Sequence, residues 1–108
     1  MKLGLGEFEQ IVLLAVLRLG AGAYGVTIRR EIRECTGRDA APGALYNTLD
    51  RLEEKRLLAS RTGESTPQRR GRPKRYFTVT RSGHAAVRRT QRAYQRLVAG
   101  LKLGGANA

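Results

Sequence analysis

Residues 5–19 constrain the fold most strongly, because apolar residues recur there at helical spacing and surround the predicted helix on nearly every side. The recurring positions are Leu5, Phe8, Val12, Ala15, Val16 and Leu19. A helix that is hydrophobic all round must be buried on more than one face. Since a chain of 108 residues builds only a small core, we expect one face to meet that core. The other face, with Phe8 and Val12, is predicted to meet a second copy.

Two more helices are predicted between residues 24 and 56. The first begins near Tyr24, carries Ile28, Ile32 and Cys35 on one side, and ends at Thr36-Gly37. The second spans residues 42–56, opens with Pro42-Gly43, and buries a stripe made of Leu45, Leu49 and Leu52. Two helices joined by a short connection, the second with small and polar groups at its start, indicate a helix-turn-helix.

The start of helix 42–56 holds the first set of candidate DNA contacts. Gly43 and Ala44 are small enough to allow close approach to a major groove, and Asn47 can pair with adenine through two hydrogen bonds. Tyr46 can donate its hydroxyl to a phosphate, and Arg51 can reach guanine or phosphate. The carboxylates of Asp50, Glu53 and Glu54 repel phosphate, so the second half of the helix is expected outside the groove. An ordinary amphipathic surface helix is the alternative.

A β-hairpin is predicted next, with strands at residues 57–62 and 75–80 around a polar, Gly- and Pro-containing tip. The basic residues expected to contact DNA there are Arg69, Arg70, Arg72, Lys74 and Arg75. Arg70-Gly71-Arg72-Pro73 resembles the AT-hook, a peptide that binds the minor groove, and an arginine strip suits the negative potential of a narrow minor groove. The alternative is a solvated loop whose charge prevents edge pairing.

The last predicted helix begins after Thr80, which is placed to cap it, and carries a heptad-like seam. The seam consists of Gly83, Val87, Thr90, Tyr94, Leu97 and Leu101, all but the first of which are predicted at a dimer interface. Arg88, Arg92 and Arg96 repeat every four residues, which destabilises a helix unless anions lie nearby. Glu7 and Glu9 are the predicted anions, in the same chain or across a dimer, with nucleic-acid or lipid phosphate as alternatives.

These elements predict a mainly α fold with a small β-hairpin, namely a winged helix-turn-helix with an appended dimerisation helix. The winged domain is expected at residues 1–80, the dimerisation helix at 81–103, and a flexible tail at 104–108.

The net charge of +12 is distributed unevenly along the chain. Residues 1–60 carry +1, residues 61–75 carry +5 and residues 76–108 carry +6. Such a concentrated excess favours a polyanionic partner, either nucleic acid or an anionic membrane, over a merely solubilising surface.

Catalytic and metal-binding functions are not indicated. The single cysteine, Cys35, and the single histidine, His84, cannot complete a closed zinc site or an internal disulfide. Cys35 is expected in the core, with a redox-sensing thiol as the alternative, and no orienting acid accompanies a Cys–His pair. The apolar run at residues 11–17 is too short to span a membrane. We therefore expect a soluble, cytoplasmic protein that is not an enzyme, without cofactor or metal.

The string from Pro42 to Glu53, followed by Gly71-Arg72-Pro73-Lys74-Arg75-Tyr76-Phe77-Thr78-Val79-Thr80 and Gly83, resembles the PadR family of bacterial transcriptional regulators. Tyr24-Gly25 also fits the family pattern. The resemblance implies a homodimer, paired through its first and last helices, that represses promoters by binding a pseudo-palindromic operator and is often relieved by a small molecule.

This chain departs from the family pattern at two points. The usual glycine after the third helix is replaced around Arg56, and no tryptophan is present to sandwich a planar drug. Phe8 and Tyr94 are the only aromatic residues expected near that place, which argues against an aromatic-drug effector.

The leading hypothesis is therefore a dimeric, sequence-specific regulator of transcription that binds double-stranded DNA, with any effector unknown. One alternative is an architectural nucleic-acid-binding protein that contacts the backbone alone. Another is a peripheral membrane adaptor that binds anionic lipid through its last helix, which the small apolar area of the seam disfavours.

Overall fold

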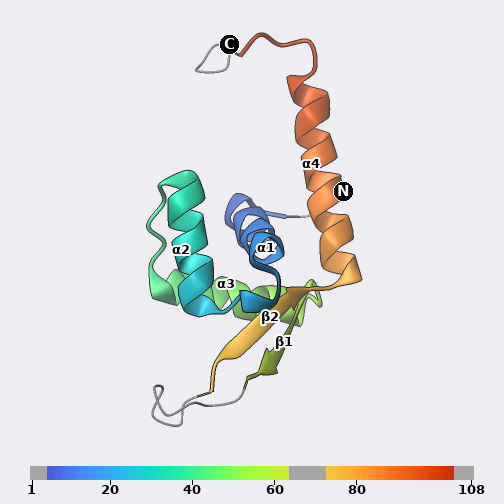
Figure 1. Ribbon diagram of the computed structural model, residues 1–108. Helices are drawn as coiled ribbons and strands as arrows, with labels where there is room; N and C mark the ends of the chain where they lie inside the picture. The colour runs from blue at the N-terminus through green and yellow to red at the C-terminus, as the bar shows by residue number, and fades with distance from the viewer. Residues whose placement is uncertain (1–4, 64–72, 104–108) are drawn as a thin grey trace.

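The computed structural model describes residues 5–63 and 73–103. In chain order the elements are α1 (Glu7–Leu19), the 3₁₀ turn η1 (Gly20–Gly22), α2 (Gly25–Thr36), α3 (Pro42–Glu54), β1 (Leu58–Thr62), β2 (Arg75–Val79) and α4 (Arg81–Val98). The strands form a two-stranded antiparallel sheet (Figure 1). The predicted fold class is confirmed. The predicted ends of the first three helices and of the strands differ from these bounds by at most two residues, but the last helix was expected to run to residue 103 and ends at Val98.

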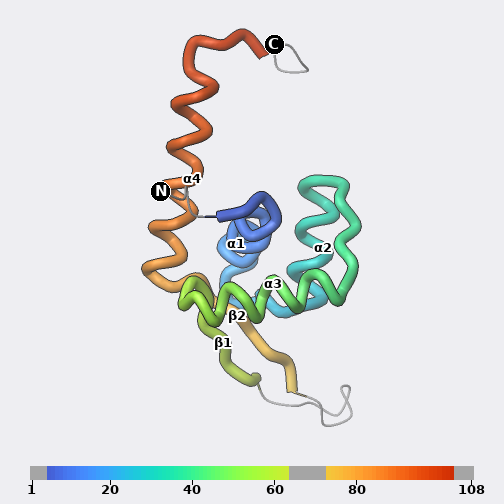
Figure 2. Tube along the Cα trace, turned by 180° about the vertical axis from the view of Figure 1, so that it is seen from behind, coloured from blue at the N-terminus to red at the C-terminus, as the bar shows by residue number. Residues whose placement is uncertain are grey.

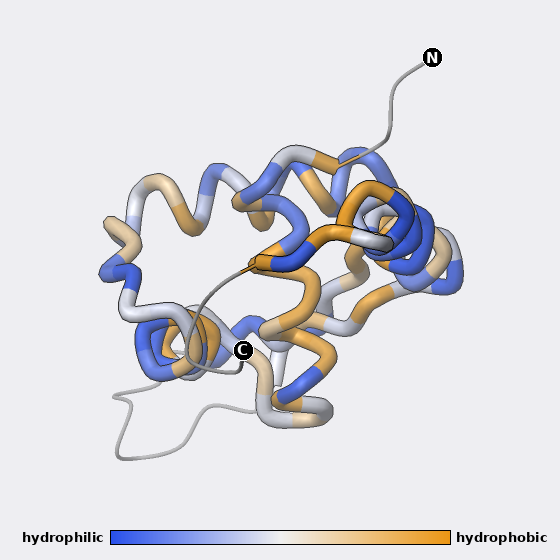
Figure 3. The backbone as a smooth tube through the Cα atoms, turned by 90° about the horizontal axis from the view of Figure 1, so that it is seen from above, coloured by the Kyte–Doolittle hydropathy of each residue, from blue (hydrophilic) through white to orange (hydrophobic). Residues whose placement is uncertain are grey.

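Helix α1 occupies the middle of the domain, with α2 on one side, α4 on the other, and α3 and the hairpin across one end (Figure 2). Its side chains Val12 and Leu13 are fully buried and pack with Ile28 of α2, Leu49 of α3 and Phe77 of β2 in one hydrophobic cluster. In the view from above, the outer helices alternate between hydrophobic and hydrophilic residues along their traces (Figure 3). This alternation is typical of helices with one buried side.

Other elements of the same chain therefore cover most of α1, whereas the sequence analysis expected them to cover only one of its faces. Val12 has no exposed surface, so it offers nothing to a second copy, contrary to its predicted place at a dimer interface. The exposed apolar side chains of α1 are instead Leu14 and Leu17, which are 39% and 38% exposed.

Helix α3 ends in a Schellman motif that has arginine where glycine is usual. Arg56 adopts a φ of 63°, the one positive φ among the non-glycine residues that the structure describes. Its N–H donates to the Glu53 carbonyl at 2.9 Å, and the Leu57 N–H donates to the Leu52 carbonyl at 2.9 Å. The helix stop is thus made by backbone hydrogen bonds despite the steric cost of a left-handed arginine.

The hairpin is fixed to the helices at its base. In its register Leu58 pairs with Val79 and Thr62 with Arg75. The Phe77 N–H donates to the Ala23 carbonyl at 2.8 Å, which attaches β2 to the turn before α2. Tyr76 meets Tyr24 edge to face, with ring centroids 5.5 Å apart. The direction of the hairpin is therefore set by the helix-turn-helix.

The start of α4 fits tightly against the residue before β1. The Thr80 hydroxyl accepts from the Gly83 N–H at 3.0 Å, as predicted for a capping residue, and it donates to the Arg56 carbonyl at 2.7 Å. A Cβ atom at Gly83 would overlap the Leu57 carbonyl oxygen. Position 83 therefore requires glycine for close packing, rather than serving as a seam residue.

Cys35 is exposed, and the prediction that it lies in the core is wrong. A groove of about 210 Å³ between α1 and α2 leaves its side chain uncovered. The Cys35 thiol lies 3.4 Å from a Glu31 carboxylate oxygen. This hydrogen bond, with some loss of hydration beside α1, raises the pKa of the thiol, which disfavours the reactive thiolate that a redox sensor needs.

Candidate nucleic-acid interface

The N-terminal half of α3 presents its small and polar residues outward. Gly43, Ala44, Tyr46 and Asn47 are all exposed, while Leu45 between them is buried. Pro42 occupies the first turn, and the N-cap residue Ala41 has no side-chain acceptor, so the first backbone N–H groups lack a side-chain cap. An N-terminus of this kind favours a negatively charged ligand. The four residues predicted to contact DNA here thus share one accessible surface.

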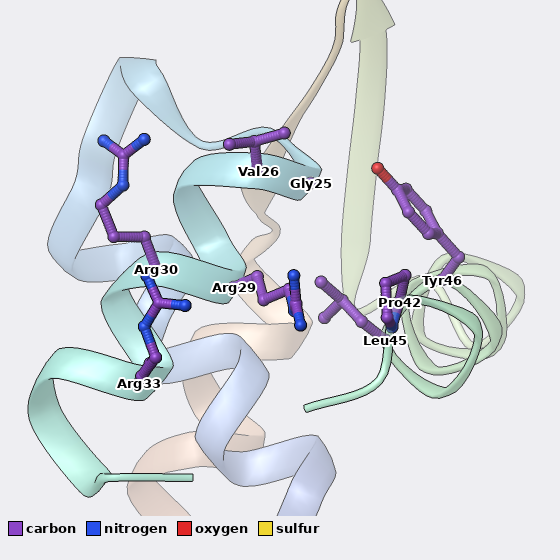
Figure 4. A pocket seen from close by; sticks show the side chains of 8 residues that line it. All are labelled: Gly25, Val26, Arg29, Arg30, Arg33, Pro42, Leu45 and Tyr46. Carbon is purple, nitrogen blue, oxygen red and sulfur yellow. The ribbon is translucent and has the colours of Figure 1, made fainter. Parts of the chain in front are cut away.

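Tyr46 is held against the start of α2. Its ring lies beside Gly25, where a Cβ atom would be 2.6 Å from the ring carbon Cζ (Figure 4). Gly25 is therefore needed for the close approach of α2 to α3. The sequence analysis noted Tyr24-Gly25 only as part of a family pattern, and it did not identify the contact with Tyr46.

Between α2 and α3 lies a cleft of about 200 Å³ with cationic walls. Its lining residues, labelled in Figure 4, are Gly25, Val26, Arg29, Arg30, Arg33, Pro42, Leu45 and Tyr46. The sequence analysis missed this cleft, although three arginines within five residues were a visible signal. The guanidinium groups and the Tyr46 hydroxyl are suitable donors for phosphate oxygens.

Arg29 has a structural task at the floor of this cleft. It donates to the Ala40 carbonyl at 2.7 Å and to the Asp39 carboxylate at 2.9 Å. Both acceptors belong to the connection that leads into α3. Arg29 thereby holds the N-terminus of α3 beside α2. Among the described residues, neither Arg30 nor Arg33 forms a comparable ion pair.

Arg51 forms an ion pair with α1, although 54% of its side-chain surface remains exposed. Its guanidinium lies 3.4 Å from the Glu9 carboxylate, which also accepts from the Lys55 ammonium at 2.8 Å. Burial raises the pKa of the Glu9 carboxyl, but hydrogen bonds from Lys55, the Gly6 N–H and Arg51 outweigh it, and the pKa falls below its ordinary value. A DNA contact by Arg51 would require this ion pair to loosen.

Arg75 joins the hairpin to the C-terminal half of α3. Its guanidinium donates to Asp50 at 3.1 Å and forms a second ion pair with Glu53. It also lies over the Phe77 ring, 4.8 Å from the centroid. Arg75 thereby pairs with two of the three carboxylates that the sequence analysis expected to repel phosphate, and its single positive charge offsets part of their negative charge.

The tip of the wing, with the predicted contacts Arg69, Arg70 and Arg72, lies outside the described residues. At its base the Lys74 ammonium lies over the Tyr24 ring, 4.5 Å from the centroid. The Arg61 guanidinium lies 4.8 Å from the centroid of Tyr76. Cations therefore flank the base of the wing, one on β1 and one just before β2.

The predicted seam of α4 divides into two halves. Val87 and Thr90 are buried against the chain's own core, and the Gln10 side chain donates to the Val87 carbonyl at 3.3 Å. Tyr94, Leu97 and Leu101 are 50%, 72% and 60% exposed, and Leu101 follows the end of α4 at Val98. The C-terminal part of α4 extends beyond the body of the domain (Figure 1). The inner half has no side-chain surface left for a second copy, whereas the outer half has.

The N-terminal residues of α1 do not neutralise α4. Glu7 pairs with Arg38 at 3.1 Å, and Glu9 pairs with α3 as described. Within one chain, the predicted ion pairs with Arg88, Arg92 and Arg96 are therefore not formed. Phe8, predicted at the dimer interface, is half-buried. The Arg38 guanidinium lies over it, 4.7 Å from the centroid of the Phe8 ring.

Comparison with known proteins identifies the family. The profile of the family described as "Transcriptional regulator PadR-like family" matches residues 13–89, which include α2, α3, the hairpin and the start of α4. The chain belongs to the PadR-like family. It is accordingly a DNA-binding transcriptional regulator and not an enzyme, as the sequence predicted.

Solved structures of PadR-like proteins share this fold. A PadR-like transcription factor from Bacteroides fragilis is 26% identical, with a TM-score of 0.69 over 83% of this chain and 82% of that one. A PadR family regulator from Eggerthella lenta is 25% identical, with a TM-score of 0.69 over 87% and 81%. A transcriptional regulator from Clostridium thermocellum has a TM-score of 0.70 at 23% identity, over 83% and 84%. None of the curated proteins compared with the chain matches it.

Other kinds of site find no support within residues 5–63 and 73–103. No group of three or more His, Cys, Asp and Glu side chains is placed to hold a metal ion in this part of the chain. None of the helices described there is long and apolar enough to cross a bilayer.

Proposed function

We propose that this PadR-like regulator is a homodimeric repressor that reads its operator by inserting the N-terminal half of α3 into the major groove. The observation that carries the proposal is the shared exposure of Gly43, Ala44, Tyr46 and Asn47 at an uncapped helix start. Asn47 is the residue assigned to base recognition, because its amide can pair with adenine. Gly43 and Ala44 allow the backbone to approach the groove.

The cationic cleft and the wing would hold the DNA backbone on either side of α3. Arg30 and Arg33 line the cleft beside Tyr46, and their guanidinium groups suit phosphate. We assign the wing residues Arg69, Arg70 and Arg72, together with Lys74, to phosphate or minor-groove contacts. Arg51 and Arg75 support this interface by orienting α3, since both are engaged in ion pairs with carboxylates.

Dimerisation would use the outer half of the α4 seam. Tyr94 and Leu97 of α4, together with Leu101 three residues beyond its end, would make up an exposed apolar strip. Burial of such a strip against a second copy would be favourable at about 25 cal/mol per Å². Leu14 and Leu17 of α1 are the exposed apolar residues that the partner's strip could cover. Two α3 helices held in this way would read half-sites about one helical turn apart.

A sequence-specific operator is tested by selecting binding sites from random duplexes and measuring the spacing of the half-sites. The proposal expects an inverted repeat, and an affinity for it that falls by about 0.9 log units per log unit of salt for each phosphate neutralised. In transcription from a promoter that carries the selected site, added protein should lower the yield of transcript. We place this action in the cytoplasm of a bacterial cell, where a transcriptional regulator meets promoter DNA.

The competing function, an architectural protein that contacts the backbone alone, predicts the same salt dependence without an inverted repeat. Competition distinguishes the two, because unrelated duplexes would then displace a selected site at equal concentration. Equal affinity for selected and unrelated duplexes would contradict sequence-specific regulation.

A further inference from the structure

The side of α4 that faces away from α1 carries a continuous set of arginines. At about 100° per residue, these arginines point opposite the seam that contains Val87 and Thr90. We call this surface the basic face; its residues are Arg81, Arg88, Arg89, Arg92 and Arg96, all of them exposed. Residues 76–108 contain no acidic residue, so nothing on α4 itself offsets this charge.

The basic face also lacks counter-ions from the rest of the described chain. The ion pairs of the described residues all join acidic side chains to arginines or a lysine outside α4, and the acidic residues are Glu7, Glu9, Glu31, Asp39, Asp50 and Glu53. Arg88, Arg92 and Arg96 are spaced four residues apart, and like charges at this spacing destabilise a helix. A bound polyanion would remove this repulsion.

The basic face is remote from the surface proposed to read DNA. The N-terminal half of α3 lies beside α2, whereas α4 starts near the other end of α3 and rises away from it (Figures 1 and 2). Because the arginines lie opposite the seam, pairing of two copies through Tyr94, Leu97 and Leu101 would leave them accessible.

The composition of the basic face selects the kind of partner. Guanidinium groups bind phosphate oxygens through two parallel hydrogen bonds. The remaining side chains on this side are His84, Ala85, Gln91 and Gln95, so the large apolar anchors typical of protein interfaces and of membrane-inserted helices are missing. Uniform positive charge without apolar anchors suits a nucleic-acid backbone.

We propose that the basic face of α4 is a second DNA-binding surface, which holds the phosphates of another duplex segment regardless of sequence. A protein bound through α3 could then bridge two segments of DNA. This proposal does not depend on whether α3 reads a defined operator.

A sandwich experiment tests the proposal with two random-sequence duplexes. One duplex is immobilised and loaded with protein, excess protein is washed away, and a fluorescent second duplex is added. The wild type should retain the second duplex. Arg88→Gln/Arg92→Gln should still bind the first duplex but retain at least fivefold less of the second, with a salt slope for capture lower by about 1.8 if both contacts are lost.

The matched control removes the same charge from the surface proposed to read DNA. Arg30→Gln/Arg33→Gln should weaken loading on the first duplex, while the molecules that do load capture the second duplex as the wild type does. Arg88→Lys/Arg92→Lys should restore most of the capture, because the charge is kept. Glutamine is a good helix former, so melting temperatures at or above that of the wild type are expected for the α4 variant.

Undiminished capture by Arg88→Gln/Arg92→Gln would overturn the proposal, because the second duplex would then be held elsewhere, for example by the other α3 of a dimer. A second result would also overturn it. If the wild-type protein captures no second duplex but floats with anionic vesicles in a density gradient, the basic face binds lipid instead.

Discussion

Gly25 lies against the ring of Tyr46, so closely that a Cβ atom at position 25 would stand 2.6 Å from the ring carbon Cζ. This contact brings the start of α2 next to the start of α3 and shapes one wall of the cationic cleft. The geometry of the proposed DNA-reading surface therefore depends on the absence of one side chain.

Gly25→Ala should displace Tyr46 and weaken DNA binding by more than it reduces stability, because the ring is partly exposed and can swing aside. In a Tyr46→Ala background the same substitution should have little effect, giving a coupling of roughly 1 kcal/mol in the free energy of unfolding. Chemical denaturation of the four proteins measures it. Additive effects would show that the contact between Gly25 and Tyr46 does not affect stability.

Gly43→Ala is the control for adding a methyl group to a helical glycine. A Cβ atom at position 43 meets nothing within 4 Å, so this substitution should stabilise α3 by about 0.5–1 kcal/mol.

Glu9→Gln should lower the free energy of unfolding at pH 7 by about 1.5–3 kcal/mol, because the buried carboxylate accepts from Lys55 and Arg51. The folded pKa of Glu9 lies below its ordinary 4.5. The wild type is therefore more stable than Glu9→Gln by the full amount above the pKa of Glu9 in the unfolded chain. This difference in unfolding free energy disappears as the pH falls through the pKa of Glu9 in the folded protein. Urea denaturation between pH 3 and pH 7 (about four conditions) measures this difference, which should shrink only at the acidic end. Glu7→Gln, in an exposed pair, should leave stability nearly unchanged at every pH.

Arg56→Gly should stabilise the protein by about 0.5–1 kcal/mol, since glycine adopts the left-handed conformation without the steric cost that arginine bears. Thermal unfolding followed by circular dichroism reads this out as a higher melting temperature. Arg56→Ala removes the same side chain but keeps the steric cost. If both variants shift stability equally, the backbone conformation is not the cause.

Leu97→Glu should dissociate the proposed dimer without unfolding the domain, because Leu97 is 72% exposed and touches little of its own chain. Sedimentation equilibrium gives the subunit mass, and circular dichroism checks that α4 stays helical. Gln95→Glu, which adds the same charge on another side of α4, should remain dimeric. A Leu97→Glu protein with the mass of the wild type would move the interface elsewhere.

Asn47→Ala should change the base preferred at one position of each half-site, with a loss of about 1–3 kcal/mol in discrimination. Its affinity for unrelated duplexes should stay the same, because the amide is assigned to a base edge. Arg33→Gln should instead weaken binding to all duplexes and lower the salt slope by about 0.9. Binding titrations against a panel of single-base variants separate the two. An unchanged preference in Asn47→Ala would remove this residue from base recognition.

The sequence predicted the fold well because its signals are local. Apolar residues at helical spacing located α1 to α3, Pro42 marked the start of α3, and Thr80 marked the cap of α4. The outward face at Gly43 to Asn47 follows from the position of Leu45 and Leu49 on the same helix, and it was predicted for the same reason.

The partners of charged residues could not be predicted in this way, because they depend on how elements distant in sequence pack. Glu9 lies 46 residues from Lys55, and Arg75 lies 25 residues from Asp50. Helical spacing says which side of a helix such a residue occupies, but not which helix lies opposite. The same limit explains Cys35, whose position continues an apolar stripe although the groove beside it is open.

Because its seam is divided, α4 would set the rotation of one subunit relative to the other in the proposed dimer. Its inner half is anchored to α1, and its outer half would fix the orientation of a partner. One residue inserted between Thr90 and Tyr94 would turn the outer half of α4 by about 100° relative to the inner half and lengthen the helix by about 1.5 Å. The angular register of that single turn would thus decide whether two α3 helices face the same side of a DNA duplex.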